Sequence, residues 1–236
     1  MSFLNSLKEA VDREEDITTF VNPFSYCVLR QEPEVIGSFT VKFDGMVLSA
    51  LYSFLISPVD RCSFDMTSMA PVVFERAVQE KKTVYFIGAR SEEVTGAVRN
   101  ILARFPDLQV IGCRDGYFAN ADELEEVCAT LGKINPDIVI CGMGTPLQEK
   151  FLLKLKTHLW RGVGFTCGGF LHQSAGDDLE YYPRWVNVLN LRWLYRMYRE
   201  PKVVRRVVLI YPLFLGFFAV DWFRMRIAGH FGRGRP

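Results

Sequence analysis

Residues Asp137–Glu149, DIVICGMGTPLQE, contain the strongest signal for the fold class. Its first part, Asp137–Cys141, is an apolar and β-branched run, which predicts a buried strand. The strand runs directly into Gly142, and helical spacing follows from Gln148 to His158. A strand, a glycine loop and a helix in this order form the repeating unit of a parallel sheet with helices on both faces.

The same alternation continues on either side of this stretch. Further strands are predicted at Thr83–Ile87, from Leu108 to Ile111 and at Val163–Cys167, and further helices at Glu92–Phe105 and Asp122–Leu131. The sequence therefore predicts an α/β fold with a Rossmann-like parallel sheet and flanking helices. Ligands of such sheets bind at the carboxyl ends of the strands, so the loops there should converge on one edge. These loops are Gly88–Arg90, Arg114–Tyr117, Gly142–Pro146 and Gly168-Gly169.

Charge is distributed unevenly along the chain. Residues 1–183 contain seventeen Lys or Arg and twenty-five Asp or Glu, whereas residues 184–236 contain eleven and two. The whole-chain charge of +1 therefore combines an acidic body with a basic tail. We predict an α/β catalytic domain at 1–183 and a basic, helical, membrane-associating appendage at 184–236, because anionic lipid attracts such a tail.

Within this tail, Val207–Val220 (VVLIYPLFLGFFAV) carries no charge. Pro212 and Gly216 interrupt the run and Asp221 closes it. The run is shorter than the roughly 20 apolar residues that a spanning helix needs. We predict a monotopic segment lying in the membrane interface, with Trp222 and Tyr211 as anchors. An ordinary core helix and a short true span are the alternatives.

Composition and spacing argue against several classes of protein. A hydrophobic content of 49% with 23% charged residues is that of a globular chain. The N-terminus lacks the basic and apolar regions of a secretory signal. The six cysteines form no CxxC pair and the three histidines add no metal-ligand spacing, so we predict reduced thiols and neither a metal nor a cofactor. No GxGxxG follows the first strand, which argues against a nicotinamide-dependent oxidoreductase.

The loop Gly142–Pro146 is a candidate phosphate-binding segment. Its two glycines let the backbone approach a ligand closely, and the following helix offers its N-terminus to an anion. Gln148 and Glu149, in the first helical turn, could hydrogen-bond a sugar or base, or cap the helix. On glycine spacing alone, a tight turn without a ligand is equally consistent with this loop.

Asp44 is a candidate general base. It follows an alternating apolar stretch that ends at Phe43, and it precedes the apolar predicted helix Met46–Ile56. A carboxylate at a strand end, held partly out of water, can take a proton from a substrate hydroxyl. An ordinary Asp-Gly turn is the alternative.

Arginines form a stripe on the predicted helix Leu191–Arg206. Arg192, Arg196, Arg199 and Arg206 share one face of that helix. A row of guanidinium groups matches a diphosphate or lipid head groups, because each can bind phosphate oxygens in a bidentate fashion. A solvated stripe is the alternative.

Together these segments resemble the WecG/TagA/CpsF family of bacterial glycosyltransferases. The resemblance runs from about Phe20 to Arg206. Its motifs occur in order as Asp44-Gly45, the GMGTPLQE of Gly142–Glu149, Gly168-Gly169, the YYPRW of Tyr181–Trp185, the LRWLYR of Leu191–Arg196, and Glu200-Pro201.

The resemblance implies transfer of a hexose from a UDP-sugar to a polyprenyl-diphosphate-linked sugar. Such enzymes build exopolysaccharide, capsule, O-antigen or teichoic acid at the cytoplasmic face of the bacterial inner membrane, here as a peripheral or monotopic protein. The resemblance further implies inversion without an essential metal, with Asp44 as the base and Gln148 near the donor. C-terminal arginines would bind the lipid diphosphate, and the candidates are Arg192, Arg196, Arg199, Arg205 and Arg206.

Several positions depart from the common family pattern. Asn22 is the candidate counterpart of the asparagine in an early Thr-Pro-Asn segment, and Leu191-Arg192-Trp193 replaces a Leu-Glu-Trp. His172 and Gln173 follow the double glycine where Phe-Asp is frequent; we interpret them as substrate contacts, with a buried core histidine as an equal alternative. These departures predict a donor or acceptor other than N-acetylmannosamine on lipid-linked N-acetylglucosamine. The predicted donor contacts are Asn22, Gly142, Gly144, Thr145, Pro146, Gln148, Glu149, Gly168 and Gly169.

The expected partners are the nucleotide sugar, the lipid-linked acceptor and the membrane surface, and no nucleic acid. The sequence leaves a homo-oligomer open. The alternative function is a non-catalytic, membrane-docked scaffold that binds a nucleotide sugar without consuming it.

Overall fold

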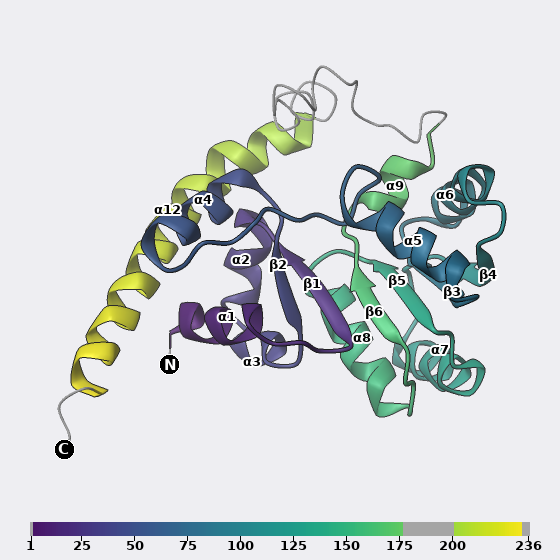
Figure 1. Ribbon diagram of the computed structural model, residues 1–236, viewed down its shortest axis with the longest axis horizontal. Coiled ribbons are helices and arrows are strands. Elements are labelled where there is room, and N and C mark those ends of the chain that lie inside the picture. Colours follow the sequence, from purple (N-terminus) through teal and green to yellow (C-terminus); the bar gives the residue numbers. More distant parts are fainter. Residues whose placement is uncertain (1, 177–200, 233–236) are drawn as a thin grey trace.

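The computed structural model describes residues 2–176 and 201–232, with side chains described for 2–176 and 208–227. Strands and helices alternate as the sequence predicts (Figure 1). In chain order the elements are α1 (Phe3–Val11), β1 (Ile17–Val21), α2 (Pro23–Leu29), α3 (Pro33–Ile36), β2 (Thr40–Phe43), α4 (Met46–Leu55), α5 (Met69–Gln79), β3 (Thr83–Gly88), α6 (Ser91–Arg104), β4 (Gln109–Arg114), α7 (Ala121–Ile134), β5 (Ile138–Gly142), α8 (Leu147–Thr157), β6 (Val163–Thr166), α9 (Phe170–Ser174) and α12 (Pro201–Gly232).

The strands form one six-stranded sheet with the order β2-β1-β6-β5-β3-β4. Every neighbouring pair is parallel, which confirms the predicted parallel α/β fold. Because all the strands point the same way, the loops that follow them lie along a single edge of the sheet.

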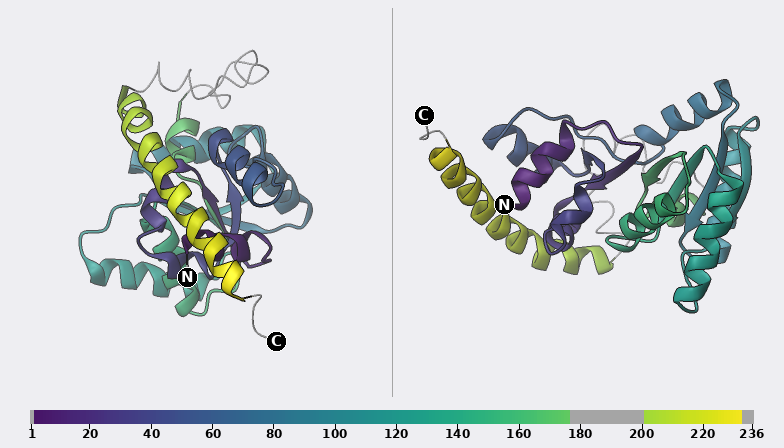
Figure 2. Two further views of the ribbon diagram at one scale, coloured as in Figure 1. Left: turned by 90° about the vertical axis from the view of Figure 1, so that its left-hand side faces the viewer. Right: turned by 90° about the horizontal axis from the view of Figure 1, so that it is seen from below.

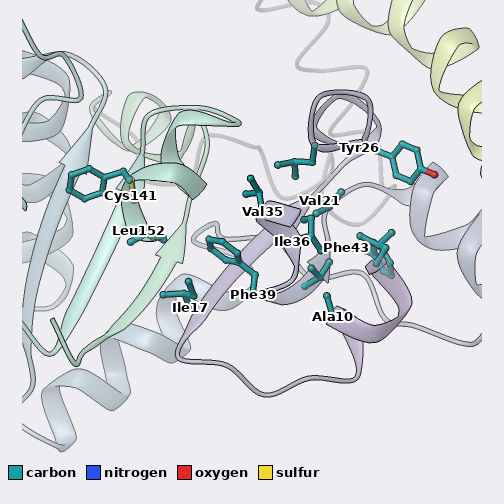
Figure 3. Packing of buried hydrophobic residues seen from close by; sticks show 14 of the residues in the cluster. Ala10, Ile17, Val21, Tyr26, Val35, Ile36, Phe39, Phe43, Cys141 and Leu152 are labelled. Carbon is teal, nitrogen blue, oxygen red and sulfur yellow. The ribbon is translucent and has the colours of Figure 1, made fainter. Parts of the chain in front are cut away.

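Alternating side chains divide the core between the two faces of the sheet. In β5, Val139 and Cys141 join the cluster that includes α7 and α8, whereas Ile138 and Ile140 join the cluster that includes α5, α6 and α9. This burial on both faces explains why β5 is a continuous apolar run in the sequence. Figure 3 shows part of the first cluster, in which side chains from the N-terminal segments gather with Cys141 and Leu152.

Helix α12 is one continuous helix on the outside of the molecule, at the β2 end of the sheet (Figures 1 and 2). The helix therefore continues through Pro212, Gly216 and Asp221, the positions that interrupt or end the apolar run in the sequence. The physical reason is tertiary packing: Phe214 and Phe218 are buried against the ring of Tyr26 in α2, and this contact supports the helix through its proline.

The carboxylate of Asp221 lies within this apolar helix because its oxygens have hydrogen-bond donors there. It is 1% exposed, and its two oxygens accept hydrogen bonds from Arg30 Nε (2.7 Å) and Arg30 Nη2 (3.0 Å). The hydroxyl of Tyr26 donates a third, at 2.9 Å. Asp221 therefore faces the domain, where it ties α12 to the end of α2.

Within the described residues, Val208–Ile227 is the one segment long and apolar enough to cross a membrane, judged by length and composition alone. The predicted boundary between residues 183 and 184 lies outside the described residues. The division into two domains, and the basic character of the appendage, therefore stay predictions.

Candidate functional site

Predicted site segments lie on four neighbouring strands at the carboxyl edge of the sheet. Asp44 follows β2, Asn22 follows β1, Gly168 follows β6 and Gly142 ends β5. Neighbouring strands are about 4.8 Å apart, so the row extends over roughly 14 Å. A row of this length suits an extended ligand rather than a compact one.

Glycines let the neighbouring loops approach each other closely. A Cβ atom on Gly88 would lie 2.4 Å from the carbonyl carbon of Gly142, and one on Gly142 would lie 2.9 Å from Cys167 Sγ. A Cβ on Gly116 would lie 2.7 Å from Met143 Cγ. These contacts bring together the loops after β3, β4, β5 and β6, as the sequence predicts.

Gly144 and Gly168 differ from these packing glycines. Their φ angles are +79° and +51°, a region that favours glycine, and a Cβ on either would meet no atom within 4 Å. Backbone conformation, rather than crowding, therefore selects glycine at both positions. The open space beside them leaves backbone of both loops accessible to a ligand.

Gln148 joins the two loops. Its side chain is buried, and its Oε1 accepts a hydrogen bond from the Gly168 N–H at 3.1 Å. Its Nε2 donates to Thr145 Oγ1 at 3.3 Å and to Glu149 Oε1 at 3.1 Å. The predicted donor residues Thr145, Gln148 and Gly168 thus form one connected group, with Pro146 preceding the first turn of α8.

Glu149 lies beneath this group, with no exposed surface. Besides the Gln148 amide, its Oε1 accepts hydrogen bonds from Thr19 Oγ1 (2.8 Å) and Thr145 Oγ1 (3.2 Å). Thr166 Oγ1 donates in turn to Thr19 Oγ1 at 3.0 Å. In the described fold the buried side chain of Glu149 supports the loop, and its contact with a donor stays a prediction.

Burial of the Glu149 carboxyl group disfavours its charged form. Its Oε2 is buried and has no hydrogen-bond partner among the described residues. Burial raises the pKa of Glu149, although the hydrogen bonds from Gln148, Thr19 and Thr145 act in the opposite direction. Sequence reasoning missed Thr19 and Thr166, and the available signal was the presence of threonines inside otherwise apolar strands.

Asp44 is partly exposed, and Arg61 lies beside it. The Asp44 N–H donates to the Val21 carbonyl at 2.8 Å, which fixes the turn after β2. Arg61 pairs with Phe43 in an isolated parallel bridge, and its Nη2 lies 4.0 Å from Asp44 Oδ1. The site thus combines a carboxylate with a guanidinium. Sequence reasoning missed Arg61, because its approach depends on the return of the chain after α4.

Asn22 lies next to the Asp44 turn. A Cβ on Gly45 would be 3.7 Å from Asn22 Cβ. The Oδ1 of Asn22 accepts hydrogen bonds from the N–H groups of Phe24 and Ser25, both at 3.0 Å, and so caps α2. Asn22 therefore has a structural role in the described fold, and its contact with a donor stays a prediction.

His172 and Gln173 lie on α9. The His172 side chain is 61% exposed, and its Nδ1 is 2.8 Å from Glu93 Oε1. The alternative of a buried core histidine is therefore wrong. Gln173 is half-buried, and its N–H donates to the Gly169 carbonyl at 3.0 Å. Substrate contact by either side chain stays a prediction.

The predicted arginine stripe is not part of this geometry. Arg192, Arg196 and Arg199 lie outside the described residues. Arg205 and Arg206 lie in the first turns of α12, and their side chains are not among those described. Among the described residues, no three His, Cys, Asp or Glu side chains lie close enough to hold a metal ion.

The fold and its edge define a class of protein. A parallel α/β sheet with open glycine backbone, a helix N-terminus and a carboxylate along its carboxyl edge is an arrangement used by enzymes that bind nucleotides. A family model, the glycosyl transferase WecG/TagA/CpsF family, matches residues 1–228. The chain belongs to this family and is a glycosyltransferase.

Three curated relatives carry specific activities. The chain is 35% identical over 204 residues, which are 86% of it and 85% of the relative, to a UDP-Gal:alpha-D-GlcNAc-diphosphoundecaprenol beta-1,4-galactosyltransferase of Shigella boydii. It is 29% identical over 134 residues to an N-acetylglucosaminyldiphosphoundecaprenol N-acetyl-beta-D-mannosaminyltransferase of Bacillus subtilis, covering 57% of the chain and 51% of the relative. The enzyme of the same description from Bacillus spizizenii is 28% identical over 138 residues, covering 58% and 52%.

Proposed function

We propose that this protein transfers galactose from UDP-galactose to N-acetylglucosamine linked to undecaprenyl diphosphate, in the synthesis of a bacterial surface polysaccharide. The carrying observation is the row of Asp44, the Gly168 loop and the Gly142–Thr145 loop on neighbouring strands of a family member. The relative that supports galactose as the donor is similar over 86% of the chain. The acceptor named for all three relatives is the same lipid-linked sugar.

The donor diphosphate would rest on the backbone N–H groups after Gly142 and on the N-terminus of α8. The partial positive charge of a helix N-terminus favours an anion there. Gln148 holds this loop to the Gly168 loop, so the two sides of the diphosphate site are fixed relative to each other. Glu149 and Thr19 support the same loop from below.

The chemical step is a single displacement at the anomeric carbon. Asp44 would accept the proton of the acceptor hydroxyl while that oxygen forms its bond to the anomeric carbon. The bond from this carbon to the diphosphate oxygen breaks on the opposite face, so UDP leaves and the configuration inverts. In a metal-independent reaction, the α8 N-terminus and arginines would stabilise the charge on the departing UDP. Arg61 would supply a fixed positive charge beside the base.

The protein would work as a peripheral or monotopic enzyme at the cytoplasmic face of the inner membrane. Helix α12 is packed against α1 and α2, with Asp221 bound to Arg30. A crossing helix would have to leave these partners, whereas a helix lying on the bilayer keeps them. We therefore propose that α12 lies along the membrane surface and leaves the carboxyl edge open to the lipid-linked acceptor.

The deciding experiment is UDP release by the purified protein in EDTA, with a panel of UDP-sugars and a short-chain diphosphate-linked N-acetylglucosamine acceptor. The expected result is acceptor-dependent UDP release with UDP-galactose. Release that appears only after divalent metal is restored would overturn metal independence. Tight UDP binding without release, across the panel and with longer acceptors, would favour the scaffold instead.

A further inference from the structure

Helix α4 presents an apolar face to solvent. Its sequence MVLSALYSFL contains no charged residue, and it packs on the core through Leu48 and Tyr52. The opposite face consists of Met46, Val47, Ala50 and Phe54, all exposed. Surface helices of globular proteins normally place polar residues on this side, so an outer face made only of apolar residues indicates a nonpolar partner.

Helix α12 presents a second apolar face. Leu209, Leu213, Val220, Phe223 and Ile227 share one side of the helix and are 44% to 59% exposed. This side is opposite the one that carries the buried Phe214, Phe218 and Asp221. The Asp221 contacts therefore hold the apolar face outward, toward solvent.

The C-terminal end of α4 lies beside α12. Trp222 Nε1 donates a hydrogen bond to the Leu55 carbonyl at 3.4 Å, which places the end of α4 beside α12 (Figure 1). An exposed phenylalanine is adjacent in sequence to each of these two residues. Phe54 precedes Leu55 and is 86% exposed. Phe223 follows Trp222, is 59% exposed and contacts the Trp222 ring with centroids 5.1 Å apart.

Charge at the border of this surface identifies the occupant. Arg224 and Arg226 are exposed and lie on either side of the α12 apolar face. Arginines bordering an apolar face suit anionic lipid head groups above acyl chains. A second copy of this chain would bring the same basic residues to the contact, and their repulsion would oppose such a dimer.

We propose that the exposed faces of α4 and α12 form one bilayer-contacting surface. Because α4 begins two residues after Asp44, its contact with lipid holds the catalytic edge at the level of the head groups, where the diphosphate of a lipid-linked acceptor lies. The role of α4 in holding the catalytic edge near the lipid-linked acceptor rests on the proposed function. Membrane contact itself does not depend on catalysis and is tested without donor or acceptor.

The test is co-sedimentation of the full chain with vesicles of phosphatidylethanolamine and phosphatidylglycerol, compared for wild type, Phe54→Ser and Phe223→Ser. Each substitution is expected to lower the vesicle partition coefficient about tenfold, since each removes an apolar side chain from the interface. The matched control is Leu159→Ser, because Leu159 is 78% exposed but lies before β6, at the opposite edge of the sheet. It should bind vesicles like the wild type. Circular dichroism checks the fold of each variant.

Three outcomes would overturn the proposal. If Phe54→Ser binds vesicles as well as the wild type does, α4 does not belong to the bilayer-contacting surface. Equal losses in Phe54→Ser and Leu159→Ser would indicate unspecific adsorption. If Phe54→Ser and Phe223→Ser lose a self-association that light scattering detects in the wild type, and still bind vesicles like the wild type, the occupant of the surface is a second copy of the chain. Vesicle binding through Phe54 by a protein that releases no UDP would leave this inference standing while the proposed function fails.

Discussion

Replacing Asp221 by alanine tests how α12 is attached to the catalytic domain. The Asp221 carboxylate is buried and accepts three hydrogen bonds, two from Arg30 and one from Tyr26, at 2.7 to 3.0 Å. Asp221→Ala removes all three and leaves the guanidinium and the phenol without their acceptor. The side chain is lost from a helix whose neighbouring contacts are otherwise apolar.

The expected loss follows from the burial of the pair. Removing one partner of a buried ion pair costs about 3–5 kcal/mol, because the other charge stays buried. The Arg30 side chain is 22% exposed and can be partly hydrated, so we expect the lower end, about 3 kcal/mol. At about 2–4 °C per kcal/mol for a chain of this size, the melting temperature should fall by about 6–12 °C.

The assay is urea and thermal denaturation followed by circular dichroism. Arg224→Ala is the matched control, because Arg224 lies on the same helix and is exposed. Asp221→Leu combined with Arg30→Met should recover part of the loss, since apolar residues then fill the site. A loss below about 1 kcal/mol for Asp221→Ala, the range of exposed ion pairs, would refute a buried attachment of α12.

Four further predictions concern the site and are tested on the purified chain. Asp44→Ala should lower acceptor-dependent UDP release by about 10²–10⁴-fold with an unchanged circular dichroism spectrum, because the general base is lost; full activity would contradict this role. Gln148→Ala should weaken UDP binding in calorimetry more than Lys150→Ala does, because only Gln148 ties the two loops together. Glu149→Gln should change how stability depends on pH. Burial raises the pKa of Glu149 in the folded state, so the wild type loses stability as the pH rises from below the unfolded pKa through the folded one, and the variant lacks this loss. Parallel curves of melting temperature against pH would contradict it. Charge reversal of Arg196 and Arg199 should reduce turnover of lipid-diphosphate acceptors more than donor binding; equal losses would argue against an acceptor role.

Much of the fold could be predicted from the sequence because its signals are local. Asp137–Cys141 is apolar throughout because β5 is covered on both faces, and the glycine after it marks the end of the strand. Once the strands are parallel, their carboxyl ends must share an edge. The convergence of the Gly142 and Gly168 loops follows from that rule.

Contacts across the sheet could not be predicted in this way. Thr19 and Glu149 are 130 positions apart, and they meet because β1 lies next to β6 and α8 covers that part of the sheet. Arg61 reaches Asp44 because the chain returns to the edge of β2 after α4. Strand order and the return of a loop depend on the packing of the whole chain, so the spacing of residues within one segment does not predict them.

The apolar tail shows most clearly the difference between what local sequence predicts and what depends on tertiary contacts. The uncharged character of residues 207–220 and the basic character of the segment around them follow directly from composition. The continuation of the helix through Pro212 and Asp221, and the side of it that faces the domain, depend instead on packing against α2. The reason is that a buried carboxylate requires donors, and the donors of Asp221 come from α2 and its end, about 190 residues earlier in the chain.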